Sequence, residues 1–519
     1  MNQSTESAFH LGEFPKSFPL MIGITVLSIT SVYLYSVISD FLQAFLERPA
    51  HFLPFKISQV VKPTKVDVPL VELKEGGDYR ELLARGSEQY PDRPFKLRHP
   101  PGEIVILPFK YMDMIKNAPE SKLSFQQGSF DMLMGQHTGI TAHDLEMATV
   151  IRRDVGRLLD RVHTIVDDEA IDAMKQEIGP CDDWTEVLLL PKAVRMIVKV
   201  SQRVFVGEPL CRDERWIQTI TNSTAASFGS VNKLWAGNWM TRPFIAWRDP
   251  GLSAMRKYKK SSYDLIGPVL DQRLKNLQDP DFKAPPDLMQ LVIDGWKDGK
   301  GRTLDHQVHT QFGTGRAALF TTGITVYYLI YDLATHPEYI EPLREEVVGL
   351  GGAPMTRANV AKLTKLDSFI RECQRWSKFF LVGTLRKVIQ PLKLDDGTVL
   401  PVGTLLAVDA HNAVFNKSLL EDPYKFDGFR FERLRAQEGN SMKYQAATTG
   451  PDHLVFGHGT QACPGRFFAI HEIKVALARI LLNYDFKLKD KPVHSPMARV
   501  AGVVTNADPS VKFLFKSRK

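Results

Sequence analysis

The chain has 519 residues and 44% apolar content, which is ordinary for a globular protein and sufficient for a large core. Its formal net charge of +7 is mild for this length, and no basic stretch interleaved with aromatic residues suggests a nucleic-acid partner. Four cysteines lie far apart without a CxxC pair, which argues against a disulfide framework and a structural zinc site. We expect three of them, Cys181, Cys211 and Cys373, to be inert core residues.

Residues 17–39 form an uncharged, mostly apolar segment. As a helix rising about 1.5 Å per residue, it is long enough to cross a bilayer core of about 30 Å. Mainly acidic residues precede it and basic residues follow it. The positive-inside tendency therefore predicts a single-pass anchor, with residues 1–16 in the lumen and the main body in the cytosol. A buried helix remains the alternative, because the segment contains several serines and threonines.

Residues 40–66 follow this segment, and Pro49, Pro54 and Pro63 interrupt any regular pattern there. Such a stretch predicts a stiff linker. No comparable stretch occurs within residues 67–519, so we expect this remainder to form one large domain.

The start of that domain predicts one helix and two strands. The helical pattern covers residues 78–91, and the strands cover residues 94–99 and 103–108, with a Pro-Gly turn between them. Helical patterns then dominate from Phe109 to about Gln374.

A central helix is predicted at residues 310–333, which contain almost no charge apart from Arg316 and Asp332. A helix this long and this apolar runs through the centre of a fold rather than over its surface. Its end is predicted at residues 335–337, where a proline opens the next helix.

Two patterns near this helix are interpreted as coincidences. Residues 313–318 fit GxGxxA, but no strand precedes them and no βαβ unit surrounds them, so we expect no nucleotide binding. His306 and His309 could suggest a metal pair. No further ligand lies near them in the sequence, and a polar helix start explains them better.

After Trp376, short β-branched runs alternate with Asp-Gly and Pro-Val-Gly turns, which predicts small sheets. A last long helix is expected just after Pro464, with apolar residues on one face. These residues are Ile470, Ile473, Leu477 and Leu481. The tail at residues 499–515 again predicts strands. The predicted fold class is therefore mainly α with small β-sheets.

The segment FGHGTQACPG at residues 456–465 is the strongest chemical signal in the chain. A thiolate that binds haem iron needs an electropositive pocket, which the metal and backbone N–H groups aimed at the sulfur provide. By the chain's own residue frequencies, FxxGxxxCxG arises by chance in roughly one chain of this length in a thousand. We therefore predict that Cys463 is the axial ligand of a haem iron rather than a buried core cysteine.

The residues around this cysteine suit that role. Gly457, Gly459 and Gly465 let the backbone pass close beneath a flat macrocycle, where a Cβ would clash. Pro464 and Gly465 open a helix whose positive N-terminal end points toward the thiolate. Phe456 supplies an apolar shield that limits the access of water.

The segment resembles the haem-binding loop of the cytochrome P-450 superfamily, and other motifs follow in the order of that family. Glu372 and Arg375 match its E-x-x-R helix, and residues 426–431 (FDGFRF) resemble the later segment whose arginine, here Arg430, joins the pair. The resemblance implies that these three residues form a buried triad that locks the cysteine loop and has no catalytic role. It covers nearly everything after the linker and implies the cytochrome P-450 fold, with a single large haem domain.

Arg386 matches the family position whose guanidinium binds a haem propionate, for which an exposed strand arginine is the alternative. Arg152 and Arg153 are candidates for the other propionate, although the family's common Trp-xxx-Arg pattern is absent there. Gln461 stands where many relatives carry a cation, so that contact is neutral or missing in this chain.

Residues 317–322 (AALFTT) resemble the family's oxygen-activation segment, in which small residues leave room above the iron and a threonine relays protons. Thr321 takes that role here, while a threonine bonded back to its own helix is the alternative. Phe320 stands where an acidic residue is usual, and it cannot shuttle a proton. Proton delivery would then run through Thr321, Thr322 and water.

The resemblance implies a monooxygenase that uses haem b, O2 and electrons from NADPH–cytochrome P-450 reductase, with its anchor in the lipid of the endoplasmic reticulum membrane. The substrate would be a small hydrophobic molecule. Residues 331–347 and 456–469 are most similar to fungal enzymes of secondary metabolism, which often oxidise terpenoid or indole-terpenoid skeletons. The expected pocket lining is Ala318, Phe320, Phe380, Val382, Gly383 and Val503.

Two alternatives to a monooxygenase remain open. The first is a haem-thiolate enzyme that rearranges or dehydrates its substrate without net oxygen insertion, which Phe320 favours. The second is a non-enzymatic membrane haem protein, against which the intact cysteine loop and Thr321 argue.

Overall fold

The computed structural model describes residues 66–74, 77–99, 102–140, 145–238, 240–296, 298–418, 420–490 and 499–518, together with Tyr35. Apart from Tyr35 and residue 66, the predicted lumenal segment, anchor and linker at residues 1–66 lie outside this set. The chain divides into two units, Met1–Val60 and Val61–Lys519, and all the elements below belong to the second.

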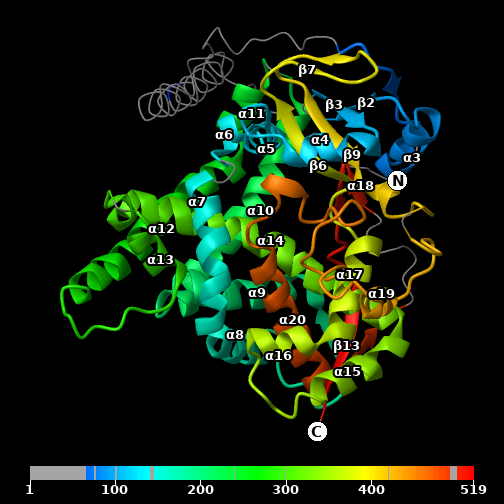
Figure 1. The fold of residues 1–519 in the computed structure, drawn as a ribbon. Coiled ribbons are helices and arrows are strands. Elements are labelled where there is room, and N and C mark those ends of the chain that lie inside the picture. Colours follow the sequence, from blue (N-terminus) through cyan, green and yellow to red (C-terminus); the bar gives the residue numbers. More distant parts are fainter. Residues whose placement is uncertain are drawn as a thin grey trace, which may run out of the picture. The chain divides into compact units, whose positions relative to one another are not determined.

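Helices make up most of the second unit, and in Figure 1 most of the long ones lie below the largest sheet. The long helices are α8 (Gly156–Glu177), α9 (Leu189–Phe205), α10 (Glu214–Ala236), α12 (Pro250–Asn276), α14 (Leu304–Thr335), α17 (Thr364–Trp376) and α20 (Arg466–Asn483). The shorter ones are α3 (Tyr79–Gln89), α4 (Met112–Asn117), α5 (Phe125–Met132), α6 (Gly135–Thr138), α7 (Leu145–Val150), α11 (Arg242–Arg248), α13 (Leu288–Gly295), α15 (Ile340–Val348), α16 (Arg357–Lys362), α18 (Ala410–Ala413) and α19 (Arg430–Ala436).

The predicted central helix is confirmed as α14. The hydroxyl of Thr303 caps it by accepting a hydrogen bond from the N–H of His306 (3.4 Å), and the helix packs against α9, α10, α12 and α20. It is long and apolar enough to cross a membrane. However, 67% of its most apolar stretch of 18 residues is buried in the protein, as in a core helix. After Thr335, the predicted proline opens a 3-10 helix at Pro337–Tyr339, which continues as α15.

The largest sheet has six strands in the order β1-β2-β3-β9-β6-β4. They are β1 (Leu70–Val71), β2 (Phe95–His99), β3 (Gly102–Leu107), β4 (Leu123–Ser124), β6 (Val382–Val388) and β9 (Leu405–Asp409). β2 and β3 form the predicted antiparallel pair, and β3 also pairs in parallel with β9. β6 carries a bulge between Gly383 and Arg386, where Thr384 adopts φ = +52°. Bulges redirect the side chains that follow them, and here that side chain is Arg386.

Smaller sheets lie elsewhere in the described residues. One contains β10 (Tyr484–Leu488), β13 (Lys512–Ser517) and β5 (Thr185–Leu188), and two are the pairs β11 (Arg499–Ala501) with β12 (Val504–Asn506) and β7 (Leu392–Lys393) with β8 (Val399–Leu400). The strands predicted after Trp376 and in the tail are confirmed. β5 has no counterpart in the sequence prediction, because four residues between two helices show no clear alternation.

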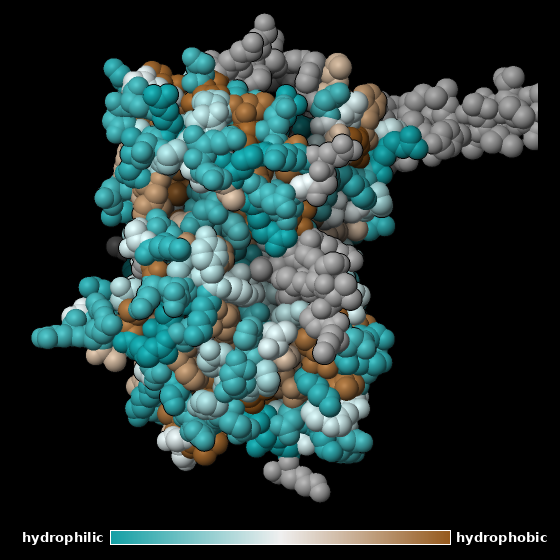
Figure 2. Space-filling model, turned by 90° about the vertical axis from the view of Figure 1, so that its right-hand side faces the viewer, coloured by the Kyte–Doolittle hydropathy of each residue, from teal (hydrophilic) through white to brown (hydrophobic). Residues whose placement is uncertain are grey.

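The main core is built largely by α8, α9, α14, α17 and α20. The predicted apolar face of α20 is buried in it, and Cys181, Cys211 and Cys373 are buried as expected. On the face shown in Figure 2, hydrophilic side chains predominate and apolar ones occur in small groups, as is usual for a globular surface. The predicted class, mainly α with small β-sheets, is confirmed.

Candidate active site

Cys463 lies in a loop that ends at the start of α20. Its N–H donates to the carbonyl of Phe456 (2.8 Å), which closes the loop on itself. α20 begins at Arg466 with Gly465 as its N-cap, as predicted for the residues that follow Pro464. The positive end of this helix therefore lies directly behind the cysteine.

Cys463 is half-buried, and the backbone N–H groups of Gly465 and Arg466 stabilise its thiolate. Burial raises the pKa of the thiol, and the two N–H groups lower it by a smaller amount. A metal ion at the sulfur reverses this balance, because it binds and stabilises the thiolate. This donor set suits a soft metal ligand rather than an exposed nucleophile.

The three glycines of the loop differ in what surrounds them. Gly457 and Gly459 adopt left-handed conformations with φ of +66° and +81°. A Cβ on Gly459 would lie 2.0 Å from the carbonyl oxygen of Lys116 in α4. The close approach that requires glycine at this position is therefore to the backbone of α4, which the sequence did not indicate. At Gly465 a Cβ would meet no other part of the chain closer than 3.9 Å.

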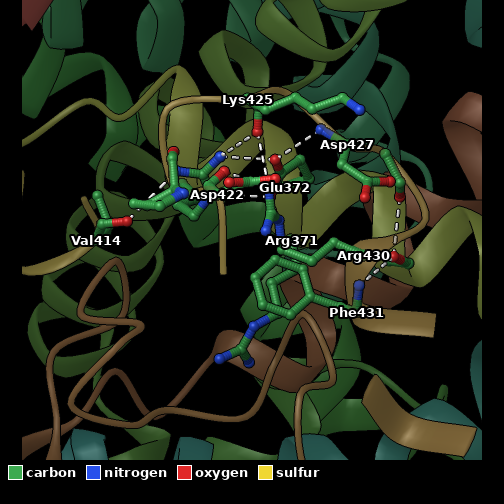
Figure 3. A network of polar contacts seen from close by, with 12 residues as sticks. Arg371, Glu372, Val414, Asp422, Lys425, Asp427, Arg430 and Phe431 are labelled. Atoms are coloured by element: carbon green, nitrogen blue, oxygen red, sulfur yellow. Dashed lines mark hydrogen bonds and ion pairs between the residues drawn. The ribbon is translucent and has the colours of Figure 1, made fainter. Parts of the chain in front are cut away.

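The structure brings Glu372, Arg375 and Arg430 together, and Figure 3 labels Glu372 and Arg430 of this group. The carboxylate of Glu372 accepts hydrogen bonds from Nε (2.8 Å) and Nη2 (2.7 Å) of Arg375 and lies 3.6 Å from Nε of Arg430. Both partners of the first pair have fully buried side chains. Other donors of the two arginines reach backbone carbonyl groups, namely those of Val414, Glu421, Asp422, Pro423 and Lys425. The triad thus fixes the segment between β9 and α19.

Arg371, next to Glu372 in α17, holds the segment that leads into the cysteine loop. Its guanidinium donates to the carbonyls of Gln445 (2.8 Å) and Thr448 (3.1 Å) and pairs with Asp452 (2.7 Å). Sequence reasoning missed this residue. A signal existed, because Arg371 lies four residues before Arg375 and therefore shares its face of the helix.

Arg386 follows the bulge in β6 and is 1% exposed. Its Nη1 donates to the carbonyl of Leu385 (2.8 Å), whereas its Nε and Nη2 are buried without a partner among the described residues. Burial lowers its pKa to about 10, so the guanidinium is charged at neutral pH. Arg386 is therefore not an exposed strand arginine.

Ion pairing separates Arg386 from the other buried arginines. Five of the six buried arginines in the described part of the chain pair with a carboxylate, and Arg386 does not. The five are Arg273, Arg344, Arg371, Arg375 and Arg430. A buried cation with unused donors fits an anionic group from outside the chain, such as a propionate.

Gln461 connects the cysteine loop to the start of α5. Its amide nitrogen donates to the carbonyls of Ala118 (3.0 Å) and Leu123 (2.9 Å), and its oxygen accepts from the N–H of Phe125 (3.0 Å). The ring of Phe125 lies 5.9 Å from the guanidinium of Arg386. The cysteine loop and Arg386 therefore meet at the same point of the fold.

Arg152 and Arg153 point to different partners. Arg152 donates to the carbonyl of Thr460 (3.3 Å) in the cysteine loop, whereas Arg153 pairs with its neighbour Asp154 (2.6 Å). Of the two, only Arg152 contacts the loop.

One stripe of α14 is exposed although the helix runs through the core. Ala317 and Thr321, one turn apart, are exposed, whereas Thr322 is 4% exposed and lies in the core. The hydroxyl of Thr321 donates to the carbonyl of Ala317 (3.1 Å), which is the back-bonded arrangement that the sequence left open. Thr321 and Thr322 thus face different surroundings.

Phe320 closes one side of this stripe with two other aromatic residues. It stacks on Phe228 of α10, with 4.7 Å between ring centres, and meets Phe379 edge-on at 5.8 Å. These rings form an apolar wall beside Thr321.

The other predicted pocket residues divide into two groups. Phe380 is 47% exposed, and Ala318 is half-buried at the edge of the core. Val382 and Val503 are buried, and a Cβ on Gly383 would lie 2.9 Å from Cβ of Leu454. The burial of Val382 and Val503 and the close approach at Gly383 are explained by packing within the protein.

The cysteine loop and α14 share one hydrophobic cluster, because Phe456, Ala318 and Phe320 all pack against it. The site therefore combines a half-buried sulfur at a helix N-terminus, an uncovered stripe of a core helix and a buried cation that forms no ion pair. These three features are complementary to a flat apolar macrocycle that carries a metal ion and carboxylate groups. The residues present fit haem.

Comparisons with known proteins agree with this geometry. The family model for cytochrome P-450 matches residues 159–514. The chain is 36% identical over 477 residues to the cytochrome P-450 monooxygenase BOA4 of Botryotinia fuckeliana, covering 90% of this chain and 95% of the relative. It is 34% identical over 466 residues to the cytochrome P-450 monooxygenase ataF of Aspergillus terreus, covering 88% and 94%.

Solved structures share the fold. The cytochrome P-450 CYP102L1 aligns with a TM-score of 0.62 and 18% identity, over 88% of this chain and 100% of the other. The retinoic acid-bound cyanobacterial CYP120A1 aligns with a TM-score of 0.62 and 17% identity, over 84% and 94%.

Fold, cysteine loop and unpaired arginine together define a haem-binding oxidoreductase. The chain belongs to the cytochrome P-450 family, as the sequence resemblance predicted. It is a monooxygenase that binds haem b and acts on a small molecule with O2 and a redox partner.

Proposed function

We propose that Cys463 holds the haem iron and that the enzyme oxidises a terpenoid or indole-terpenoid in fungal secondary metabolism. The first part is supported by the half-buried position of Cys463 and by the backbone N–H groups at the start of α20 that stabilise its thiolate. The second part is supported by the likeness of residues 331–347 and 456–469 to fungal enzymes of that kind, and by the fungal origin of the relatives.

The haem, when bound, supplies the activation of O2. Arg386 holds a propionate through its unused Nε and Nη2, while Glu372, Arg375 and Arg430 keep the cysteine loop in place and take no part in the reaction. The loop thereby presents the sulfur of Cys463 in a fixed position.

Thr321 is the proton relay in this proposal. Its hydroxyl now donates to the carbonyl of Ala317, so it must turn toward the exposed stripe before it can donate to a bound group or a water molecule. Phe320 carries no proton and limits water on one side through its contact with Phe228. The buried position of Thr322 assigns it to packing, so we place the relay at Thr321 alone.

A second candidate function follows from Phe320. Where an acidic residue is usual, phenylalanine slows proton delivery, and the enzyme would then rearrange or dehydrate its substrate without net oxygen insertion. Product mass after turnover in isotopically labelled O2 distinguishes the two functions, because only a monooxygenase places label in the product.

The proposal also includes electrons from NADPH–cytochrome P-450 reductase and a single-pass anchor at residues 17–39 in the endoplasmic reticulum membrane, with the haem domain in the cytosol. Microsomes that contain the full chain and the reductase provide the test. We expect the protein to sediment with the membranes and to be digested by protease added from outside. Substrate-dependent consumption of NADPH would exclude the non-enzymatic haem protein.

The decisive experiment compares two cysteine variants in those microsomes. Cys463→Ala should lose the carbon monoxide spectrum of the reduced protein and all conversion of candidate terpenoids, measured by mass spectrometry. Cys181→Ala removes a cysteine that is 0% exposed and should keep both. Retention of the spectrum by Cys463→Ala would refute the assignment of the ligand.

A further inference from the structure

Arg316 occupies an unusual position in α14. It directly precedes Ala317 of the exposed stripe, and it lies four residues before Phe320, so both side chains project from the same side of the helix. Nη1 of Arg316 lies 3.4 Å from the hydroxyl of Ser227, and Phe320 stacks on Phe228. α10 packs along α14 here, and its residues 227 and 228 cover Arg316 and Phe320 in turn.

The charge of Arg316 has no counter-ion in the described part of the chain. No described carboxylate forms an ion pair with it, and its Nε is buried without a partner. Burial lowers its pKa to about 10, and no acidic group opposes this shift, yet the guanidinium is still charged at neutral pH. Its one close ring contact is with Phe312, 4.6 Å away, which leaves the charge unneutralised.

The polar α10 group that contacts Arg316 is neutral. The hydroxyl of Ser227 accepts a hydrogen bond from Nη1 of Arg316 (3.4 Å) and donates its own hydrogen to the carbonyl of Ser223. A neutral hydroxyl can accept a hydrogen bond from the guanidinium, but it does not balance the charge. The negative charge that would satisfy Arg316 must therefore come from outside these helices.

We propose that Arg316 recognises the substrate by binding an anionic group, so that the substrate is an amphipathic carboxylic acid with an apolar skeleton. The guanidinium fork matches a carboxylate in two parallel hydrogen bonds. The rings of Phe228, Phe320 and Phe379 contact the skeleton beside it. This inference rests on the proposed function and narrows its substrate to an acid of that class.

The geometry also fixes which end of such an acid reacts. Thr321 follows Arg316 by five residues, which corresponds to about 7.5 Å along the helix axis. The two residues also project about 140° apart around the helix, so a carboxylate held by Arg316 lies away from Thr321. Oxidation is directed to a carbon remote from the acid group.

The test uses the full-length haem protein and pairs of ligands that differ only in charge. The probes are dodecanoic acid with its methyl ester and dehydroabietic acid with its methyl ester, and binding is followed by the change in the haem absorption spectrum. At least one acid should bind about tenfold more tightly than its ester. Arg316→Gln should abolish this preference without changing the affinity for the ester, and Arg316→Lys should retain part of it.

Controls separate the possible failures. Arg302→Gln changes an exposed arginine and should keep the preference, and Arg316→Met is measured in parallel in case Arg316→Gln does not retain haem. Equal binding of acid and ester in the native protein, or a preference that survives both variants, would overturn the inference. If the native protein shows no carbon monoxide spectrum, the proposed function is wrong instead.

Discussion

Buried and half-buried arginines lie in two regions of the molecule and differ in what surrounds their charge. In α17, Arg371 and Arg375 each pair with a carboxylate and donate to backbone carbonyls of the segments that lead to the cysteine loop. Facing the site, Arg386 and Arg316 have no carboxylate partner in the described residues, although Arg371 shares with them a buried Nε that has no acceptor.

The difference separates structural from ligand-binding charges. A network that contains its own counter-charges is complete when the chain folds, and its loss leaves a buried charge without a partner. An enclosed guanidinium without a counter-charge opposes folding, and a bound anion offsets that cost. The comparison therefore predicts that the first pair determines stability and the second pair determines binding.

The largest expected effect is that of Glu372→Gln. The substitution leaves Arg375 and Arg430 without their shared carboxylate, which should reduce the free energy of unfolding by about 3–5 kcal/mol. Denaturant unfolding and the yield of haem-bound protein measure this loss. The exposed Glu338→Gln is the control, and equal stability of the two variants would show that the triad is not structural.

The next effect is that of Arg371→Met, which removes the ion pair with Asp452 and the hydrogen bonds to residues 445 and 448. We expect a loss of about 2–3 kcal/mol, because charged hydrogen bonds are broken in the interior. Hydrogen exchange should become faster across residues 445–452. Arg357→Met, at an exposed arginine, should leave both quantities unchanged.

Arg386→Gln should change haem retention more than stability. Without the guanidinium, a propionate loses its charged partner, and transfer of haem to apomyoglobin should become about tenfold faster, equivalent to about 1.4 kcal/mol. Arg153→Gln is the matched control, since Arg153 pairs with Asp154 away from the loop. An unchanged rate of haem transfer in Arg386→Gln would show that Arg386 does not hold a propionate.

The smallest effect is expected for the stability of Arg316→Met. This substitution keeps an apolar contact with Phe312 and removes an unpaired charge, so the free energy of unfolding should not fall by more than about 0.5 kcal/mol. If the free energy of unfolding fell by about 2 kcal/mol or more, Arg316 would be a structural residue like Arg375, and the proposed difference between the two regions would be wrong.

The sequence predicted elements whose cause is local. α14 and α20 follow from long apolar patterns, and β2 and β3 follow from two alternating runs around a Pro-Gly turn. The parallel pairing of β3 with β9 could not be predicted, because nothing near either strand specifies a partner so far along the chain. The bulge at Thr384 depends on the same pairing.

The same limit applies to the site. The cysteine loop and the triad could be named from their motifs, because each is a short pattern at a fixed interval. Arg371 and Arg316 carry no motif, and their roles depend on which carbonyls, carboxylates or rings the fold places around them. The burial of Thr322 beside the exposed Thr321 likewise follows from how α14 is rotated in the core.

The contact of Gly459 with the backbone of Lys116 has a consequence for mutational screens. Even alanine at position 459 must displace α4 or the loop, since no flexible side chain can move aside. Variants at this glycine would therefore lose activity through a folding defect, whatever part the residue has in holding the cofactor. Activity data alone would therefore suggest that Gly459 is a catalytic residue. A measurement of folding is needed to show that the substitution disrupts the structure.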